Sequence, residues 1–347
     1  MSHSRQLSAT VAAAVLLVAG LAACGGDDEL GQPEPDDGTI TVYSGRGEAL
    51  VGPVLEQFEQ ATGIEVQVRY GNTAQMAAQL LEEGDRSPAD VFYAQDAGAL
   101  GAVAKEGLFA TLPDEVLDRV PEPYRSRDGE WVGVTGRARV LVYNTDLVAE
   151  SELPESVFEL TEPQWRGRVG VAPTNGSFQA FVTGMRVLHG DEATAEWLAG
   201  IAANDPQIRD SNIPIVADVD AGTIDVGLVN HYYLYERAKE QGVPADQLTA
   251  QNYHFPDGDI GSMVNVSGVG VLAGSAGDPD VAAFLDYLLS ADAQTFFTEE
   301  TSEYPMIDVP APAGLPPLSE LTAPDIDLND LDTLERTVSM ITEAGLA

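Results

Sequence analysis

The chain has 347 residues, 44% of them hydrophobic, and its 17 Lys and Arg residues face 56 Asp and Glu residues, which gives a formal net charge of −39. This charge excludes a nucleic-acid-binding protein and opposes contact with an anionic membrane surface, because both kinds of binding need clustered cations. The apolar content is large enough to offset chain entropy, so we expect a folded acidic protein, and the length predicts about two domains.

The N-terminal segment has the pattern of a cleaved signal peptide. Residues 1–23 contain one cation, Arg5, and no acid, and their apolar run over 11–19 is too short to span a membrane. The segment ends in Leu-Ala-Ala before Cys24, the only cysteine, and this resembles the signal box of bacterial lipoproteins, in which the thiol is acylated. We therefore expect a signal peptide over 1–23, lipidation of Cys24 and an acidic tether over 24–38. The alternative is an ordinary signal peptide followed by a coincidental cysteine.

The next part of the chain alternates strands and helices. Apolar patterns predict strands over 40–43, 64–70 and 89–93, separated by helices over 49–62 and 73–83. This order predicts a doubly wound parallel sheet.

A long apolar strand over 133–143 precedes a second unit of the same architecture. The second unit has predicted strands over 168–171 and 224–229 and helices over 177–188 and 193–203. A strand over 263–272 and a helix over 281–289 follow. We therefore expect two α/β lobes of similar size, whose ligands would bind outside the carboxyl ends of the strands.

The sequence shows no catalytic arrangement. The histidines after Cys24 are His189, His231 and His254, and none belongs to a nucleophile or metalloprotease motif. Glycine loops that bind phosphate are missing too. These observations predict a binding protein and not an enzyme.

The most informative stretch is Asn230-His-Tyr-Tyr-Leu-Tyr235, which follows the predicted strand over 224–229. Adjacent tyrosines in a strand would point to opposite faces, whereas at a strand-to-helix turn both phenols can face one cleft. Taken alone, the pair is also compatible with packing or an interface, because tyrosine is common at half-buried sites.

Two other turns occupy the same position in the topology. Residues 173–178 follow a strand and open a helix, so their free backbone N–H groups and the helix dipole favour an anion. Residues 43–48 follow the first strand and offer Arg46 as a fork for a carboxylate or carbonate. Each turn alone is also compatible with ordinary helix capping.

Together these stretches resemble the ferric-ion-binding lipoproteins of bacterial iron ABC transporters, which are type-2 periplasmic binding proteins related in design to transferrin lobes. The resemblance extends from about Ile40 to the C-terminus. It rests on the collinear motifs Val42-Tyr-Ser-Gly-Arg46, Ser87-Pro-Ala-Asp-Val-Phe-Tyr93, Gly136-Arg-Ala-Arg139, Pro173-Thr-Asn-Gly-Ser-Phe178, Asp225-Val-Gly-Leu-Val-Asn-His-Tyr-Tyr233 and Glu303-Tyr-Pro305. It implies two doubly wound α/β lobes joined by a hinge, with 39–137 and 262–315 as the N-lobe and 138–261 and 316–347 as the C-lobe.

The resemblance also implies a ferric site. The tandem tyrosines that ligate Fe(III) in the family match Tyr232 and Tyr233. The groups that hold the synergistic anion in the family match Asn175, Gly176, Ser177, Asn212 and Asn230.

Two positions depart from the family pattern. Members add a histidine in the first turn and a glutamate after the third strand, whereas this chain has Gly47 and Gln95 there, with Asp96 beside Gln95. Gln95 and Asp96 are therefore candidates for an additional metal ligand or for support of the ligands. Because Gly47 cannot coordinate and an amide is a poor ferric ligand, we expect the anion, such as carbonate near Arg46 or Arg137, to fill more of the coordination sphere.

The residue types suit this chemistry independently of the resemblance. Fe(III) favours anionic oxygen, and tyrosinate is a known ferric ligand in proteins. A phenol of pKa ~10 is neutral at pH 7, but the charge of a bound ion drives its deprotonation, so affinity should fall with acid. The scarcity of histidine and of cysteine argues against zinc or copper.

We therefore predict an extracytoplasmic, monomeric protein that is lipid-anchored to the outer face of a bacterial cell membrane. It would capture ferric ion with carbonate or another synergistic anion between two lobes and deliver it to an ABC permease. Two other functions remain open at this point. The same fold can bind phosphate, sulfate or an organic anion without metal, and an extracytoplasmic hydrolase is disfavoured because the chain lacks a nucleophile.

Overall fold

The computed structural model describes residues 38–347. The predicted signal peptide, Cys24 and the predicted tether up to residue 37 lie outside these residues. The described residues belong to one compact unit. Among the helices of residues 38–347, none has the length and apolar character that crossing a membrane requires.

The strands of the described residues join in one sheet. They are β1 (Thr39–Ser44), β2 (Glu65–Tyr70), β3 (Val91–Ala94), β4 (Trp131–Asn144), β5 (Val169–Val171), β6 (Gln207–Ile208), β7 (Val226–Asn230), β8 (Ala250–Tyr253), β9 (Val264–Val271) and β10 (Tyr304–Pro305). Their order is β2-β1-β3-β9-β4-β7-β5-β6, and β8 and β10 each pair with β4 outside this path. We call the half with β1, β2, β3 and β9 the N-lobe, and the half with β5, β6, β7 and β8 the C-lobe.

The parallel sheets expected from the sequence are present in both lobes. Strand β1 pairs in parallel with β2 and β3, and β5 pairs in parallel with β6 and β7. The sheet is not parallel throughout, however, because β9 runs antiparallel to β3, and β4 runs antiparallel to both β9 and β7. A strand's direction depends on the connection that returns the chain to the sheet, and apolar periodicity does not reveal it.

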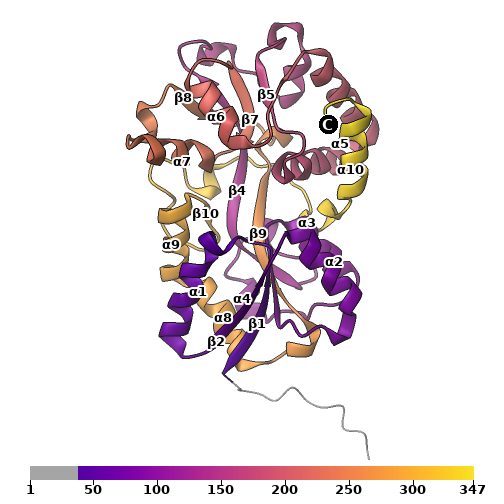
Figure 1. Cartoon of the computed structure of the whole chain (residues 1–347), viewed down its shortest axis with the longest axis vertical. Coiled ribbons are helices and arrows are strands. Elements are labelled where there is room, and N and C mark those ends of the chain that lie inside the picture. Colours follow the sequence, from indigo (N-terminus) through magenta and orange to yellow (C-terminus); the bar gives the residue numbers. More distant parts are fainter. Residues whose placement is uncertain (1–37) are drawn as a thin grey trace, which may run out of the picture. The chain divides into compact units, whose positions relative to one another are not determined.

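Strand β4 is the element that both lobes share (Figure 1). All of its residues are buried. Its first half pairs with β9 up to Ala138 opposite Val264, and its second half pairs with β7 from Arg139 opposite Asn230. Neighbouring residues of one strand therefore belong to different lobes.

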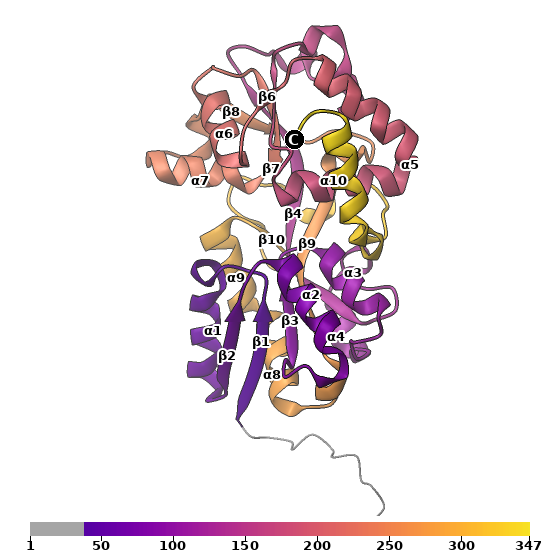
Figure 2. The ribbon, with the colours of Figure 1, turned by 45° about the vertical axis from the view of Figure 1, so that its right-hand side comes forward.

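The helices cover the two faces of the sheet (Figures 1 and 2). They are α1 (Glu48–Thr62), α2 (Thr73–Glu83), α3 (Ala97–Lys105), α4 (Asp114–Leu117), α5 (Gly176–Ala203), α6 (Asn212–Asp220), α7 (Tyr232–Gln241), α8 (Pro279–Leu288), α9 (Ala291–Thr301) and α10 (Leu334–Glu343). Both views place α1 on one side of β1 and α2 on the other. The two helices predicted over 177–188 and 193–203 are both present within α5, which is interrupted at Gly190 by a backbone φ of 83° and ψ of 164°.

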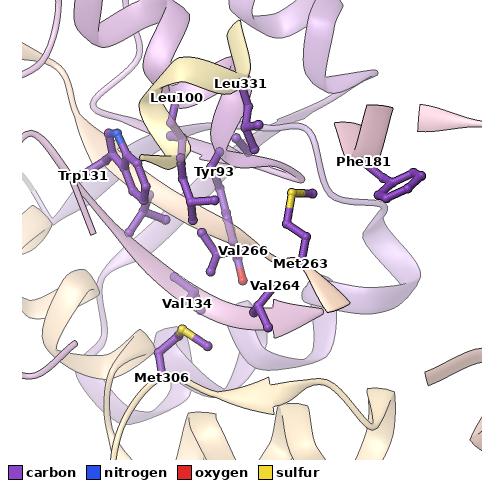
Figure 3. Close-up of a cluster of buried hydrophobic side chains, with 14 of the residues drawn as sticks. Tyr93, Leu100, Trp131, Val134, Phe181, Met263, Val264, Val266, Met306 and Leu331 are labelled. Carbon is purple, nitrogen blue, oxygen red and sulfur yellow. The ribbon is translucent and has the colours of Figure 1, made fainter. Parts of the chain in front are cut away.

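The hydrophobic core follows β4 and β9 (Figure 3). Trp131 is fully buried, and its indole Nε1 donates a hydrogen bond of 2.7 Å to Asn329 Oδ1. The chain near Leu331 packs so closely on α3 that a Cβ added at Gly98 would lie 2.4 Å from the Leu331 carbonyl oxygen. Further along the chain, α10 packs against α5 of the C-lobe. The boundaries predicted for the lobes within 316–347 remain a prediction.

Candidate functional site

A cavity of about 210 Å³ lies beside the middle of β4, next to the carboxyl ends of β3 and β7. It is lined by Gln95, Asp96, Arg137, Arg139, Asn175, Gly176, Ser177, Ala180, Asn230, Tyr232, Tyr233, Met263 and Asn265. Both lobes contribute, since Gln95 and Asp96 follow β3, and Asn230 ends β7. The structure therefore brings together most of the residues singled out from the sequence. We call this cavity the cleft.

The two tyrosines line the cleft from the start of α7. Strand β7 ends at Asn230, and α7 begins at Tyr232, so the pair lies in the first turn of a helix and not in a strand. Their ring centroids are 4.2 Å apart, with an angle of 32° between the planes. Burial and the neighbouring phenol of Tyr233 raise the pKa of Tyr232 well above its ordinary value. Without a cation in the cleft, the Tyr232 phenol is therefore neutral at pH 7.

Arg139 is a buried cation that the sequence interpretation did not assign to the site. Its side chain is 1% exposed and lines the cleft. It donates to Ser177 Oγ at 3.3 Å, to Asn230 Oδ1 at 3.2 Å and to the Leu228 carbonyl oxygen at 2.8 Å, and within residues 38–347 it has no carboxylate partner. Burial lowers the pKa of Arg139 to about 9. A buried guanidinium with only neutral partners is costly, so this position favours an anion.

Two aromatic rings stabilise the buried guanidinium of Arg139, and the spacing of Arg139 from Arg137 indicates its position at the cleft. The guanidinium carbon lies 5.7 Å from the ring centroid of Phe178 and 5.4 Å from that of Phe181, which supplies cation–π stabilisation. Arg137 and Arg139 are two residues apart in β4, and side chains at this spacing project from the same face of a strand. The Arg-Ala-Arg spacing was therefore the signal that both arginines line one cleft.

Amide and hydroxyl groups surround the start of α5. Asn175 caps this helix, and its Oδ1 accepts from Ser177 N at 3.0 Å and from Ser177 Oγ at 2.6 Å. The fully buried Asn212 donates through Nδ2 to Ser177 Oγ at 3.0 Å and to Asn175 Oδ1 at 3.3 Å. Asn230 belongs to the same network through Arg139. Gly176 is the first residue of the helix, where a free N–H can point at an anion.

The opposite side of the cleft presents fewer free groups. Asp96 caps α3 by accepting from Ala99 N at 3.1 Å, and burial raises its pKa. The Gln95 carbonyl oxygen accepts a hydrogen bond from Arg137 Nη2, and the Gln95 N–H donates to Thr73 Oγ1 at 3.2 Å. Gln95 and Asp96 both line the cleft, but the Asp96 carboxylate already caps its helix.

Arg46 does not line the cleft. Its side chain is fully buried, and its guanidinium forms a two-fold ion pair with Glu303, with Nη1–Oε1 at 3.1 Å and Nη2–Oε2 at 2.9 Å. The expectation that Arg46 contacts the anion therefore has no support in its contacts. The motif Glu303-Tyr-Pro305 does not predict this pair, because the two residues are 257 positions apart in the chain.

Gly47 directly precedes α1 at its N-cap position, with φ −66° and ψ 144°, and no atom lies within 4 Å of an added Cβ. A side chain at this position would thus meet neither backbone strain nor a clash. The glycine is not required by the local fold.

Other features of the described residues offer no competing metal site. Residues 38–347 contain no group of three or more His, Cys, Asp and Glu residues placed to hold a metal ion. A larger cavity of about 710 Å³ is lined mainly by apolar and proline residues of the segment that follows β10. His231 is buried, accepts from Ala138 N at 3.1 Å and lies 2.9 Å from the Ser302 carbonyl oxygen, so both ring nitrogens have protein partners. Its position beside the tyrosines therefore reflects packing.

Comparisons with known proteins place the chain among extracytoplasmic binding proteins. Residues 86–332 match the family described as bacterial extracellular solute-binding protein. The chain is 33% identical over 312 residues to an Fe(3+)-binding periplasmic protein of Serratia marcescens, which covers 89% of this chain and 91% of that protein. It is 32% identical over 318 residues to the major ferric iron-binding protein of Neisseria meningitidis, which covers 88% and 93%.

Solved structures give the same result for the fold. Iron-bound HitA from Pseudomonas aeruginosa matches with a TM-score of 0.79 at 35% identity, over 89% of this chain and 99% of that chain. A Trichodesmium protein in complex with iron and citrate matches with a TM-score of 0.75 at 26% identity, over 89% and 100%. The predicted two-lobe periplasmic-binding-protein fold is confirmed.

Proposed function

The chain belongs to the bacterial extracellular solute-binding proteins, and on that premise we propose that it captures ferric ion together with a synergistic anion in the cleft. Membership of a family of binding proteins also confirms the prediction that the chain is not an enzyme. The relatives named for ferric iron support the choice of cargo.

One observation carries the proposal: two adjacent phenols and an unpaired buried arginine line the same cavity. Phenolate oxygens are hard anionic ligands that suit Fe(III). The guanidinium of Arg139, the start of α5 and the amide of Asn230 suit an anion such as carbonate. Asn212 does not line the cleft and would support this anion site through its hydrogen bonds to Asn175 and Ser177. The cleft thus offers a cation site and an anion site side by side.

The metal would change the protonation of its own ligands. Burial and Tyr233 keep the Tyr232 phenol neutral when no cation is present. A trivalent ion beside the phenol reverses this preference, because its charge stabilises the phenolate more than burial destabilises it. Two phenolates and a carbonate then supply four negative charges against three positive ones. Gln95 and Asp96 would act as further ligands or as support on the other side.

The spectrum of the iron-loaded protein tests the proposal. With ferric iron and bicarbonate, the protein should become coloured through phenolate-to-iron charge transfer. The band should disappear in the Tyr232→Phe/Tyr233→Phe double variant, and it should persist in Tyr235→Phe, a matched control on the same helix whose hydroxyl donates to the Gly314 carbonyl oxygen. A wild-type protein without the band, or a double variant that keeps it, would refute ferric binding by these phenols.

A second candidate function is the binding of phosphate, sulfate or an organic anion without metal. Arg139 favours it, since an unpaired buried guanidinium attracts an anion whether or not a metal is present. Calorimetry in metal-free buffer separates the two functions. Tight binding of such an anion that is unchanged in the Tyr232→Phe/Tyr233→Phe variant would establish this alternative.

Family membership supports an extracytoplasmic role, and the Leu-Ala-Ala sequence before Cys24 supports lipidation. We propose that the protein is lipid-anchored through Cys24 on the outer face of the cell membrane, acts as a monomer and delivers its cargo to an ABC permease. Metabolic labelling with palmitate should mark the wild-type chain and not Cys24→Ser, and light scattering should give the monomer mass. The proposed lobes, 39–137 with 262–315 and 138–261 with 316–347, would close on the cargo by a hinge motion.

A further inference from the structure

A buried carboxylate is shared by two arginines beside the cleft. Glu303, which is 3% exposed, lies between α9 and β10. Its oxygens accept from Arg46 at 3.1 and 2.9 Å and from Thr135 Oγ1 at 2.8 Å, and Arg137 Nε lies 3.8 Å from Oε1. One negative charge is therefore divided between two guanidinium groups.

The two arginines have different positions relative to the cleft. Arg46 is fully buried and does not line the cleft, because both of its Nη atoms bind Glu303. Arg137 lines the cleft and is directed by its hydrogen bond to the Gln95 carbonyl oxygen. Glu303 thus compensates Arg46 nearly completely and Arg137 only in part.

The charge of this group reaches the cargo site. Arg137 lines the cleft together with Tyr232 and Tyr233, and its Nε lies 3.8 Å from Glu303 Oε1. Together Arg46, Arg137 and Glu303 carry one excess positive charge, and Arg139 adds a second on the other side of the cleft. Asp96 also lines the cleft, and its contribution is the same in every variant compared below. In a low-dielectric site, the number of uncompensated positive charges determines which negative charge on the bound anion is most favourable.

We infer that Glu303 is a specificity-determining residue that sets how much negative charge the cleft accepts in the anion bound with the metal. This inference rests on the proposed function. Glu303 does not contact the cargo itself: it acts through Arg46 and Arg137 by leaving one excess positive charge near the phenols. Removing the charge of Glu303 leaves two excess positive charges in this group, and removing the charge of Arg46 leaves none.

The test measures anion preference with isosteric variants. For each protein, ferric loading is followed by the charge-transfer band in carbonate and in citrate, and the ratio of apparent affinity in citrate, a trianion, to that in carbonate, a dianion, is determined. Glu303→Gln should raise this ratio about ten-fold, because one more positive charge rewards the more charged anion. Arg46→Gln should lower it by a similar factor.

The double variant and a distant control separate charge from structure. Arg46→Gln/Glu303→Gln has the wild-type excess charge, so its ratio should return to that of the wild type. Asp225→Asn, which removes a carboxylate paired with Arg168 at 2.6 Å outside the cleft lining, should leave the ratio unchanged. A structural role alone predicts loss for all anions equally and no rescue in the double variant.

The outcomes are distinguishable from failure of ferric binding itself. If the wild-type protein shows no charge-transfer band with either anion, the proposed function fails. If the wild type is coloured but the ratio is the same in Glu303→Gln, Arg46→Gln and the double variant, only the role of Glu303 is overturned. If Glu303→Gln does not fold, the opposite shift in Arg46→Gln and its reversal in the double variant still decide the question.

Discussion

The C-lobe side of the cleft holds two adjacent phenols, an unpaired guanidinium and a network of amides. The N-lobe side holds Gln95, Asp96 and Arg137, and Glu303 compensates part of the charge of Arg137. The boundary runs through β4, since Arg139 pairs with Asn230 of β7 and Arg137 pairs with Asn265 of β9. Two arginines only two residues apart thus belong to different walls.

This difference indicates how the site would work. The C-lobe wall has its groups already ordered by mutual hydrogen bonds, so it can bind cargo at little cost in conformational entropy. The N-lobe wall has fewer free ligands, because Asp96 caps α3 and Arg46 is paired away from the cleft. We expect cargo to bind the C-lobe wall first and the N-lobe wall to close over it.

Acid should produce the largest effect and test the phenols of the C-lobe wall. If both phenols bind iron as phenolates, each loses a proton on binding, and apparent affinity should fall about 100-fold for each unit of decreasing pH. Because burial raises the pKa of Tyr232, this dependence should extend across neutral pH. Competition with a chelator at several pH values, corrected for the protonation of the chelator and of the carbonate, measures the slope. Tyr232→Phe should reduce it to about ten-fold per unit, while the wild-type slope in Tyr235→Phe serves as the control.

If the two walls of the cleft differ, substitution of Arg139 should weaken iron binding more than substitution of Arg137. Arg139→Met should weaken iron binding in carbonate by about 10- to 100-fold, the effect of losing a hydrogen bond to a charged group. Arg137→Met should cost less, because Glu303 already compensates part of its charge. Isothermal titration of both variants, with Arg168→Met as a control outside the cleft lining, gives the comparison. Equal losses, or a larger loss in Arg137→Met, would contradict the asymmetry of the walls.

Arg139→Met also tests how Arg139 contributes to the thermal stability of the fold. Arg139 is buried without a carboxylate partner among the described residues, so Arg139→Met should leave the melting temperature of the cargo-free protein unchanged or higher. A large drop in melting temperature would show that the arginine stabilises the fold and would remove its main argument as an anion site.

The smallest expected effect comes from adding a ligand to the N-lobe wall. Gln95→Glu places a carboxylate where the wild type has an amide, and Fe(III) prefers anionic oxygen, so iron should bind up to about ten-fold more tightly. The neutral variant Gln95→Met controls for the change of side chain. If the glutamate variant binds no better than the methionine variant, the Gln95 position does not reach the metal.

Much of the fold was predictable because its signals are local. Alternation and helical periodicity located β1, β2 and β3 and the helices α1 and α2 to within two residues, and the turns of both lobes were assigned correctly as strand-to-helix turns. The role of the adjacent tyrosines could be predicted, because at a turn after a buried strand both phenols can face the same cleft. Arg139 was not assigned to the site from the sequence, although its spacing from Arg137 was a usable signal; its burial without a counter-ion had no signal along the chain.

The sequence by itself determined the parallel β–α units of both lobes, the binding-protein character of the chain and the position of Tyr232 and Tyr233 at a strand's carboxyl end, because each depends on residues close together in the chain. Only the tertiary structure decided which charges remain free in the cleft. Glu303 lies 257 residues from Arg46 and neutralises its charge by ion pairing, whereas Arg139 has no carboxylate partner among the described residues. Pairing between charges depends on three-dimensional proximity, and no pattern along the chain encodes it.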